Sequence, residues 1–240
     1  MVRTMVGEAA IHAGIPVVFL HSSNQQPSAA WPFASQLADA RFAFMPGYDL
    51  DVAVPFDQDA WEARLWDACA DGAVVVAHSF GGPIAMRAAL RRPDLVEALV
   101  LFEPAAYALG RGAHPIEAHI VRMQPVLDRA DRLDASDFIT EFIAAMTGTA
   151  PSRPASADAL IAAERQRMLP GPWTLDTPAE TGRPVLVITG EWNDEYELIA
   201  EKIPGSRHVI LSGHGHRPQD HPLAGQTVLQ FMQELQHPRP

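Results

Sequence analysis

One serine in this sequence stands between an apolar run and a turn of small residues. Ser79 follows the run 73–77 in the stretch VVVAHSFGGP. A serine nucleophile on a sharp strand-to-helix turn needs a small residue two positions before it and two after, because strand and helix pass close to each other there. Ala77 and Gly81 meet this requirement. A serine that only capped the helix would not impose it, so the pattern favours a nucleophile at Ser79.

A serine hydroxyl has too high a pKa to attack a carbonyl unaided and needs a base. The turn SGHGH at 212–216 follows an apolar run and carries two histidines, whose pKa lies near neutrality. We expect His216 to be the base, because it ends the small-residue turn and precedes the last helix. His214 is the alternative. Serine before histidine is also the chain order expected for this kind of turn.

A third polar loop, GEWNDE at 190–195, follows the apolar run PVLVIT. A buried carboxylate in this loop would hold the imidazole in one tautomer and stabilise the imidazolium. Asp194 is the residue we expect in this role.

All three loops follow segments that have the pattern of buried strands. Short apolar runs alternate with helical patterns, which is typical of a parallel sheet flanked by helices, and reactive groups of such sheets collect at the carboxyl ends of the strands. The expected strands are 15–20, 41–45, 73–77, 96–102, 184–189 and 207–211; helical spacing occupies 28–39, 57–71, 83–91, 195–202 and 222–236.

The alternation is interrupted after the fourth strand. Residues 105–178 contain only helical patterns, at 116–130, 135–146 and 155–168. We therefore expect a core built from 1–104 and 179–240, with 105–178 inserted as a helical cap over the site. Apolar side chains of this insertion have the spacing to line a pocket: Met123, Leu127, Phe138, Phe142, Met146, Met168 and Trp173.

Five stretches of the chain resemble the α/β-hydrolase fold superfamily. They are FLHSS at 19–23, VVVAHSFGG at 74–82, LVLFEP at 99–104, VLVITGEWND at 185–194 and LSGHGH at 211–216. The resemblance extends over essentially the whole chain outside the insertion. It implies an α/β fold with a mostly parallel central sheet, Ser79 as nucleophile and His216 as base.

The resemblance implies two places for the acid. Many members carry it three residues after the glycine that ends the strand, and that position is Asn193 here, with Asp194 next to it. Other members carry the acid at the end of the preceding strand, which corresponds to Glu103. We expect Asp194, with Glu103 as the alternative acid and a site without an acid as the remaining alternative.

The resemblance also implies an oxyanion hole of two backbone N–H groups. One belongs to Phe80, directly after the nucleophile. The other comes from the loop His21-Ser22-Ser23, where members usually have His-Gly; Ser23 is the expected donor and Ser22 the next choice.

Composition limits the remaining classes. The net charge is −11 and no run of Lys and Arg occurs, so a nucleic-acid partner is not expected. The single cysteine, Cys69, falls in a helical pattern and is expected in the core. No apolar run is long enough for a membrane span and the first residues lack a signal-peptide pattern, so we expect a cytoplasmic protein without a membrane partner.

These patterns together predict a serine hydrolase without a cofactor or metal. Its expected substrate is a small or medium carboxylic ester, thioester, lactone or carbon–carbon substrate, cleaved through an acyl-enzyme on Ser79. The alternatives are a lyase or cofactor-free oxygenase on the same scaffold, or a ligand-binding or sensor protein without catalysis.

Overall fold

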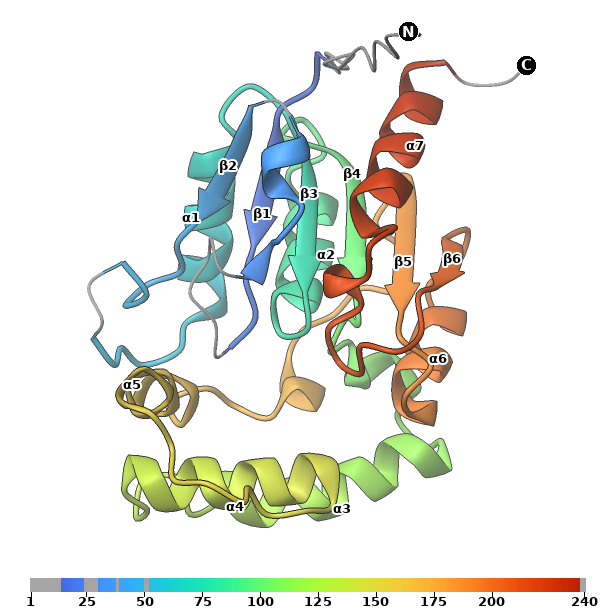
Figure 1. The fold of residues 1–240 in the computed structure, drawn as a ribbon. Coiled ribbons are helices and arrows are strands. Elements are labelled where there is room, and N and C mark those ends of the chain that lie inside the picture. Colours follow the sequence, from blue (N-terminus) through green and yellow to red (C-terminus); the bar gives the residue numbers. More distant parts are fainter. Residues whose placement is uncertain (1–13, 24–29, 38, 50–51, 238–240) are drawn as a thin grey trace, which may run out of the picture.

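The computed structural model describes residues 14–23, 30–37, 39–49 and 52–237. In this part of the chain, six parallel strands form one sheet in the order β2-β1-β3-β4-β5-β6 (Figure 1). The predicted α/β class is confirmed. The strands are β1 (Val17–Leu20), β2 (Ala40–Ala43), β3 (Ala73–His78), β4 (Val96–Phe102), β5 (Val185–Thr189) and β6 (Arg207–Ile210).

The α-helices follow the predicted spans closely. Asp57 caps the first of them through its side chain, which accepts hydrogen bonds from the N–H groups of Asp59 and Ala60. The helices are α1 (Gln58–Cys69), α2 (Gly81–Arg91), α3 (His114–Leu127), α4 (Ala135–Thr147), α5 (Ala157–Gln166), α6 (Asp194–Glu201) and α7 (Ala224–Gln236).

The sheet is buried on both faces, which explains why its central strands are continuous apolar runs. Alternate residues face opposite sides. Val75 and Ala77 of β3 pack with α1, α2 and α6, whereas Val74 and Val76 pack with α7. Cys69 is buried in the first of these two cores, as predicted.

Three α-helices, α3 to α5, separate β4 from β5. They lie beyond the carboxyl ends of the strands in Figure 1 and pack on one another through a small core of their own. Two 3-10 turns, Tyr107–Gly110 and Pro172–Thr174, stand at the two ends of this insertion. The insertion is therefore placed over the edge of the sheet at which Ser79 lies.

The helix expected over 28–39 differs from what forms. Residues 28, 29 and 38 lie outside the described part. Residues 30–37 between them form no α-helix, and a 3-10 turn occupies Ala34–Gln36. Pro32 explains the difference, because proline has no N–H to donate and disfavours helical backbone in the residue before it. Trp31 is buried there against Phe19 of β1.

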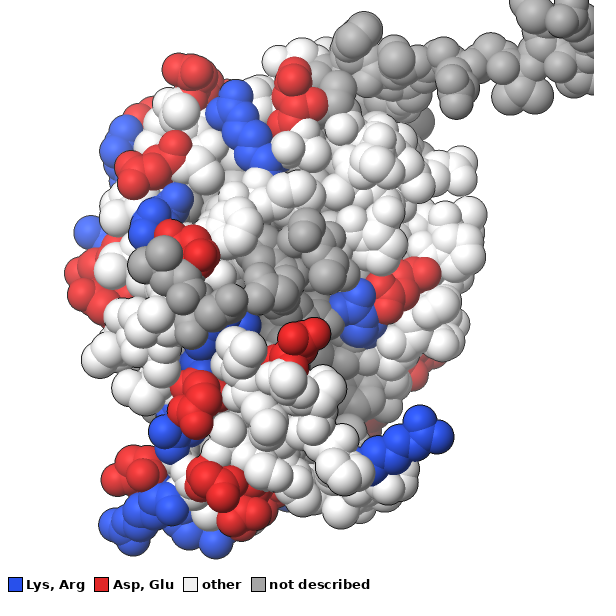
Figure 2. All heavy atoms as spheres, turned by 60° about the vertical axis from the view of Figure 1, so that its left-hand side comes forward, with Lys and Arg blue, Asp and Glu red and all other residues white. Residues whose placement is uncertain are grey.

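The surface carries both signs of charge. On the face shown in Figure 2, Lys and Arg side chains lie beside Asp and Glu side chains and do not gather into a basic patch. Among the described helices, none has the length and apolar character needed to cross a membrane.

Candidate active site

Ser79 lies on a strained turn between β3 and α2. Its φ is +51°, a conformation that costs a non-glycine residue free energy. Small neighbours are a steric requirement here: a Cβ on Gly81 would lie 2.8 Å from the carbonyl oxygen of His21, and one on Gly82 would lie 2.6 Å from Cβ of Pro104. The helix thus begins directly against the loops that follow β1 and β4.

His216 contacts the hydroxyl of Ser79. The distance between His216 Nε2 and Ser79 Oγ is 2.9 Å. The loop that carries His216 turns at Gly213 and Gly215, both with positive φ. His78 also fixes this loop, because its Nε2 lies 2.8 Å from the backbone carbonyl oxygen of His216 and donates to it.

His78 stays neutral in this position. Burial lowers its pKa well below the ordinary value, and the nearby His216 lowers it further. A neutral ring with its proton on Nε2 is the form that the carbonyl contact requires.

Glu103 is the carboxylate that contacts His216. Its Oε2 lies 3.3 Å from His216 Nδ1, and its side chain is fully buried. Two further donors hold the carboxylate: the N–H of Gly190 reaches Oε1 at 2.6 Å, and the indole N–H of Trp192 reaches Oε2 at 2.7 Å. Glu103, the residue that follows β4, has a φ of +45° and is held in an unusual conformation much as Ser79 is.

Asp194 and His214, by contrast, are not brought to Ser79. Asp194 is the first residue of α6 and is exposed. Asn193 caps this helix, because its Oδ1 accepts a hydrogen bond from the N–H of Tyr196 at 3.2 Å. His214 is exposed and packs edge-on against His221. The geometry therefore places Glu103 where Asp194 was expected and favours His216 over His214.

The two expected oxyanion donors, Phe80 and Ser23, line the same cavity as Ser79. Phe80 directly precedes α2, where backbone N–H groups have no partner within the helix. Ser79 N–H is already used, since it donates to the carbonyl of Phe102 at 3.0 Å. Ser23 lines the same cavity as Ser79, and the hydroxyl of Tyr48 donates to its carbonyl oxygen at 2.5 Å. Phe80 therefore stays the expected donor next to the nucleophile, since the N–H of Ser79 is already used.

His21 holds the loop that leads to Ser23. Its Nδ1 lies 2.7 Å from the carbonyl oxygen of Ser22, and its Nε2 accepts from the N–H of Met45 at 3.3 Å. Burial lowers the pKa of His21 to about 4, with a further lowering by Arg165. The ring is therefore neutral at pH 7, as these two hydrogen bonds require.

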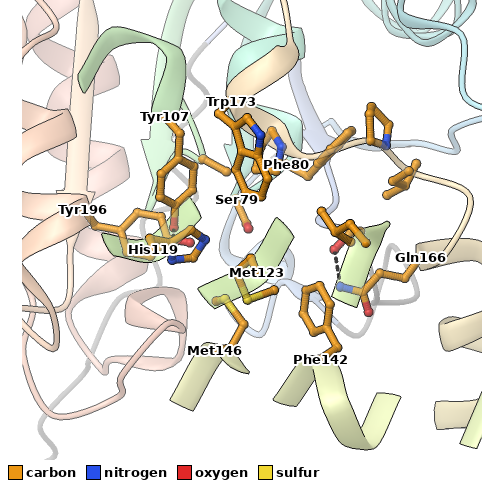
Figure 3. A pocket seen from close by; sticks show the side chains of 16 residues that line it. Ser79, Phe80, Tyr107, His119, Met123, Phe142, Met146, Gln166, Trp173 and Tyr196 are labelled. Atoms are coloured by element: carbon orange, nitrogen blue, oxygen red, sulfur yellow. Dashed lines mark hydrogen bonds between the residues drawn. The ribbon is translucent and has the colours of Figure 1, made fainter. Parts of the chain in front are cut away.

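Ser79 lines two cavities formed by the described residues. The smaller, of about 60 Å³, lies between Ser79 and the insertion (Figure 3). The larger, of about 400 Å³, extends past His216 and Trp192 to α4. Of the apolar residues expected to line a pocket, five line the smaller one: Met123, Leu127, Phe142, Met146 and Trp173. Phe138 is buried inside the insertion instead, and Met168 is exposed.

Several residues of the site were not singled out from the sequence. Trp192 and Gly190 bind the carboxylate of Glu103, and His78 holds the loop of His216. Tyr196 stacks on the ring of His216 with centroids 4.8 Å apart. The sequence feature that could have identified Trp192 is its position in a loop that follows a buried strand.

Residues 17–225 match the model of a known family, described as the Alpha/beta hydrolase family. The chain belongs to the alpha/beta hydrolase family. This alpha/beta hydrolase also resembles solved structures over nearly its whole length. The alpha/beta hydrolase of Sphaerobacter thermophilus DSM 20745 is 22% identical with a TM-score of 0.62, covering 90% of this chain and 92% of that one. The esterase of Thermogutta terrifontis, solved with malate bound, is 21% identical with a TM-score of 0.61, covering 92% and 90%.

A shorter match links this alpha/beta hydrolase to a lipase. The chain is 43% identical over 70 residues to the lipase LipV of Mycobacterium tuberculosis (strain ATCC 25618 / H37Rv). The matched region covers 29% of this chain and only 27% of that lipase. Family membership, with a lipase and an esterase among the similar proteins, supports a hydrolase. Among the described residues, no group of three or more His, Cys, Asp or Glu side chains has the arrangement of a metal site.

Proposed function

We propose that this protein is a serine hydrolase that cleaves a small or medium carboxylic ester through an acyl-enzyme on Ser79. The observation that carries the proposal is the continuous contact from Ser79 Oγ to His216 Nε2, at 2.9 Å, and from His216 Nδ1 to Glu103, at 3.3 Å. Nucleophile, base and orienting carboxylate within such distances are what acyl transfer requires.

In the proposed reaction, His216 takes the proton of Ser79 as Oγ attacks the carbonyl carbon. Glu103 accepts from Nδ1–H, which keeps Nε2 free to act as base and stabilises the imidazolium that forms. The N–H groups of Phe80 and Ser23 bind the oxyanion. The tetrahedral intermediate collapses as His216 gives its proton to the alcohol oxygen, and the alcohol leaves the acyl group on Ser79. Water then attacks the acyl carbon with His216 as base again, the bond to Oγ breaks, Ser79 recovers its proton from His216 and the carboxylic acid is released.

Three donors to the buried carboxylate of Glu103, from Gly190, Trp192 and His216, support its assignment as the acid in place of the expected Asp194. Asp194 is exposed and begins a helix. Its charge suits that position, since acidic side chains stabilise the first turn of a helix.

The two cavities support an ester substrate with an apolar character on both sides of the carbonyl. The smaller one offers space for a short acyl group, and the larger offers a path for the alcohol. Thioesters and lactones would enter by the same route.

Reaction with a fluorophosphonate probe tests the proposal. We expect the folded protein to be labelled at Ser79, the Ser79→Ala variant to remain unlabelled, and p-nitrophenyl acetate to give a burst of one product per enzyme. A folded wild type that is neither labelled nor active on short p-nitrophenyl esters would refute acyl transfer. That result would favour a lyase, an oxygenase or a binding protein on this scaffold.

A further inference from the structure

Gln166, the last residue of α5, is a buried amide in the wall of both cavities. The two cavities share the lining residues Ser23, Ser79, Phe142, Met146 and Gln166. Gln166 is only 3% exposed, and its Oε1 has no hydrogen-bond partner among the described residues. A buried polar atom without a partner lowers stability. A role in the site therefore explains this glutamine better than a role in stability does.

The NH2 group of Gln166 is directed to the loop that is expected to bind the oxyanion. Its Nε2 donates to Ser23 Oγ at 3.2 Å, the dashed line beside Gln166 in Figure 3. A serine hydroxyl has one proton to donate and two lone pairs with which to accept. Because Ser23 Oγ accepts from Gln166, its own proton points away from that amide.

Tyr48 and Arg165 hold the main chain of Ser23. The hydroxyl of Tyr48 donates to the carbonyl oxygen of Ser23 at 2.5 Å. Burial raises the pKa of Tyr48, so this hydroxyl keeps the proton that it donates. Arg165, the neighbour of Gln166 in α5, is buried with its guanidinium carbon 4.7 Å from the centroid of the Tyr48 ring. Two consecutive residues of α5 thus support Ser23, and neither the amide nor the tyrosine contact uses the proton of its hydroxyl.

Ser23 lies beside the place that the substrate carbonyl must occupy. It lines both cavities together with Ser79. Its backbone N–H is the expected second oxyanion donor, next to that of Phe80. The N and Oγ atoms of one serine are separated only by Cα and Cβ, so both can reach the same oxygen. The unused proton of Ser23 Oγ therefore has the developing oxyanion as its natural acceptor.

We propose that the hydroxyl of Ser23 is a third donor to the oxyanion and that Gln166 is the positioning residue that directs it there. The inference rests on the proposed function and adds a group to the same site. As Ser79 Oγ bonds to the carbonyl carbon, the π electron pair of the carbonyl moves onto its oxygen. That oxygen accepts the hydrogen bond from Ser23, whose proton stays on Oγ, and the electron pair returns when the intermediate collapses.

This hydrogen bond is stronger to the charged oxyanion than to the neutral carbonyl oxygen of the substrate. It therefore stabilises the transition state more than the ground state, which raises kcat and leaves KM nearly unchanged. The insertion takes part in the reaction through this contact, because α5 supplies the group that orients the hydroxyl.

The first test compares Ser23→Ala with wild type in hydrolysis of p-nitrophenyl acetate and in the rate of fluorophosphonate labelling. The variant keeps the backbone N–H and loses only the hydroxyl. We expect kcat and the labelling rate to fall at least about 10-fold, as when one oxyanion donor is removed, with KM changed less than about 3-fold. A smaller fall in kcat would overturn the proposal. An inert wild type would overturn the proposed function itself.

Thr147→Val is the matched control for the loss of a hydroxyl. Thr147 also lines the larger cavity, but its hydroxyl donates to the carbonyl oxygen of Ile143 within α4. We expect its kcat to stay within about 2-fold of wild type, since this hydroxyl has a backbone partner of its own. A loss equal to that of Ser23→Ala would show a general effect of cavity polarity and would overturn the proposal.

A double-mutant cycle tests the role of Gln166. Gln166→Leu keeps the volume of the side chain and removes the donor to Ser23 Oγ, so we expect kcat to fall about 3- to 10-fold. In the Ser23→Ala background the same change should lower kcat less than about 2-fold, because the hydroxyl that Gln166 directs is already gone. Losses that multiply in the double variant would show that Gln166 acts through packing and would overturn its positioning role.

Urea unfolding of Gln166→Leu separates this role from stability. We expect its unfolding midpoint to be no lower than that of wild type, because leucine replaces an amide whose Oε1 is unpaired. Lower kcat with undiminished stability is the expected combination. A lower midpoint together with a wild-type kcat would overturn the assignment of Gln166 to the site.

Discussion

Replacing Glu103 by glutamine should remove most of the activity while keeping the shape of the site. The carboxylate accepts from three donors, Gly190 N–H at 2.6 Å, Trp192 Nε1–H at 2.7 Å and His216 Nδ1 at 3.3 Å. An amide has only one oxygen, so its NH2 group must face one of these donors. With the amide oxygen toward Gly190, the NH2 group faces Trp192 and His216.

His216 can relieve part of this conflict by moving its proton from Nδ1 to Nε2. That tautomer turns a proton toward Ser79 and is no longer a base. For a wrong-tautomer variant of this kind the loss in kcat is about 10⁴-fold, which corresponds to about 5.5 kcal/mol of transition-state stabilisation. The opposed donors should also lower the free energy of unfolding by about 1–3 kcal/mol.

Initial rates on p-nitrophenyl acetate, with urea unfolding of the same samples, check both numbers. Asp194→Asn is the matched control, because it makes the same change of charge on an exposed carboxylate. We expect its rate to stay within about 3-fold of wild type, since exposed charges contribute little. A Glu103→Gln variant of near wild-type rate, or a larger loss in Asp194→Asn, would refute the assignment of the acid.

Three further changes probe the surroundings of this site. Gly190→Ala should lower kcat at least about 10-fold, because a Cβ there would lie 2.4 Å from the carbonyl oxygen of Gly215 and would displace the His216 loop; an unchanged rate would contradict this packing. Trp192→Phe should lower kcat about 10-fold by removing one donor to the carboxylate, with no effect expected if that contact does not form in solution. For His21, whose pKa falls from 6.5 to about 4 on burial, the stability it contributes is complete above pH 6.5 and is lost as the pH falls toward 4. Urea unfolding at pH 7 and pH 4 should therefore show about 3 kcal/mol of this loss in wild type but not in His21→Gln, and equal pH slopes would refute it.

The sheet was predictable because its signals are local. A strand covered on both faces must be apolar throughout, and the predicted strands differ from the observed ones by no more than a few residues. The turn at Ser79 was predictable for a related reason. The space between β3 and α2 admits only small side chains, and the residues two positions before and after the serine meet that requirement.

The acid was harder to predict because chain order does not say which carboxylate turns inward. Asn193 accepts a hydrogen bond from the N–H of Tyr196, and this cap makes Asp194 the exposed first residue of α6. An Asn followed by several acidic residues is itself a helix-start signal. Weighing that signal would have favoured Glu103.

The contact between His119 and Glu195 could not be predicted from the sequence. The two residues are separated by 76 positions, and they meet because α3 of the insertion packs against α6. A histidine on a helix face and a glutamate in a first helical turn each have ordinary structural roles.

Ser79 and Glu103 directly follow neighbouring strands, β3 and β4, which are paired as far as His78 and Phe102. Backbone bonds continue beyond the pairing, from Ser79 N–H to the carbonyl of Phe102 and from Ala105 N–H to the carbonyl of Ser79. His216 is the one member of the proposed triad that arrives from the edge of the sheet, after β6.

A chain divided in the exposed turn at 204–205, between α6 and β6, would therefore carry Ser79 and Glu103 on one fragment and His216 on the other. Neither half would hold a complete triad, and hydrolysis would return only when the edge strand docked again. Because of this order of the strands, the rate at which the mixed fragments release a chromogenic alcohol would measure how far the two fragments associate.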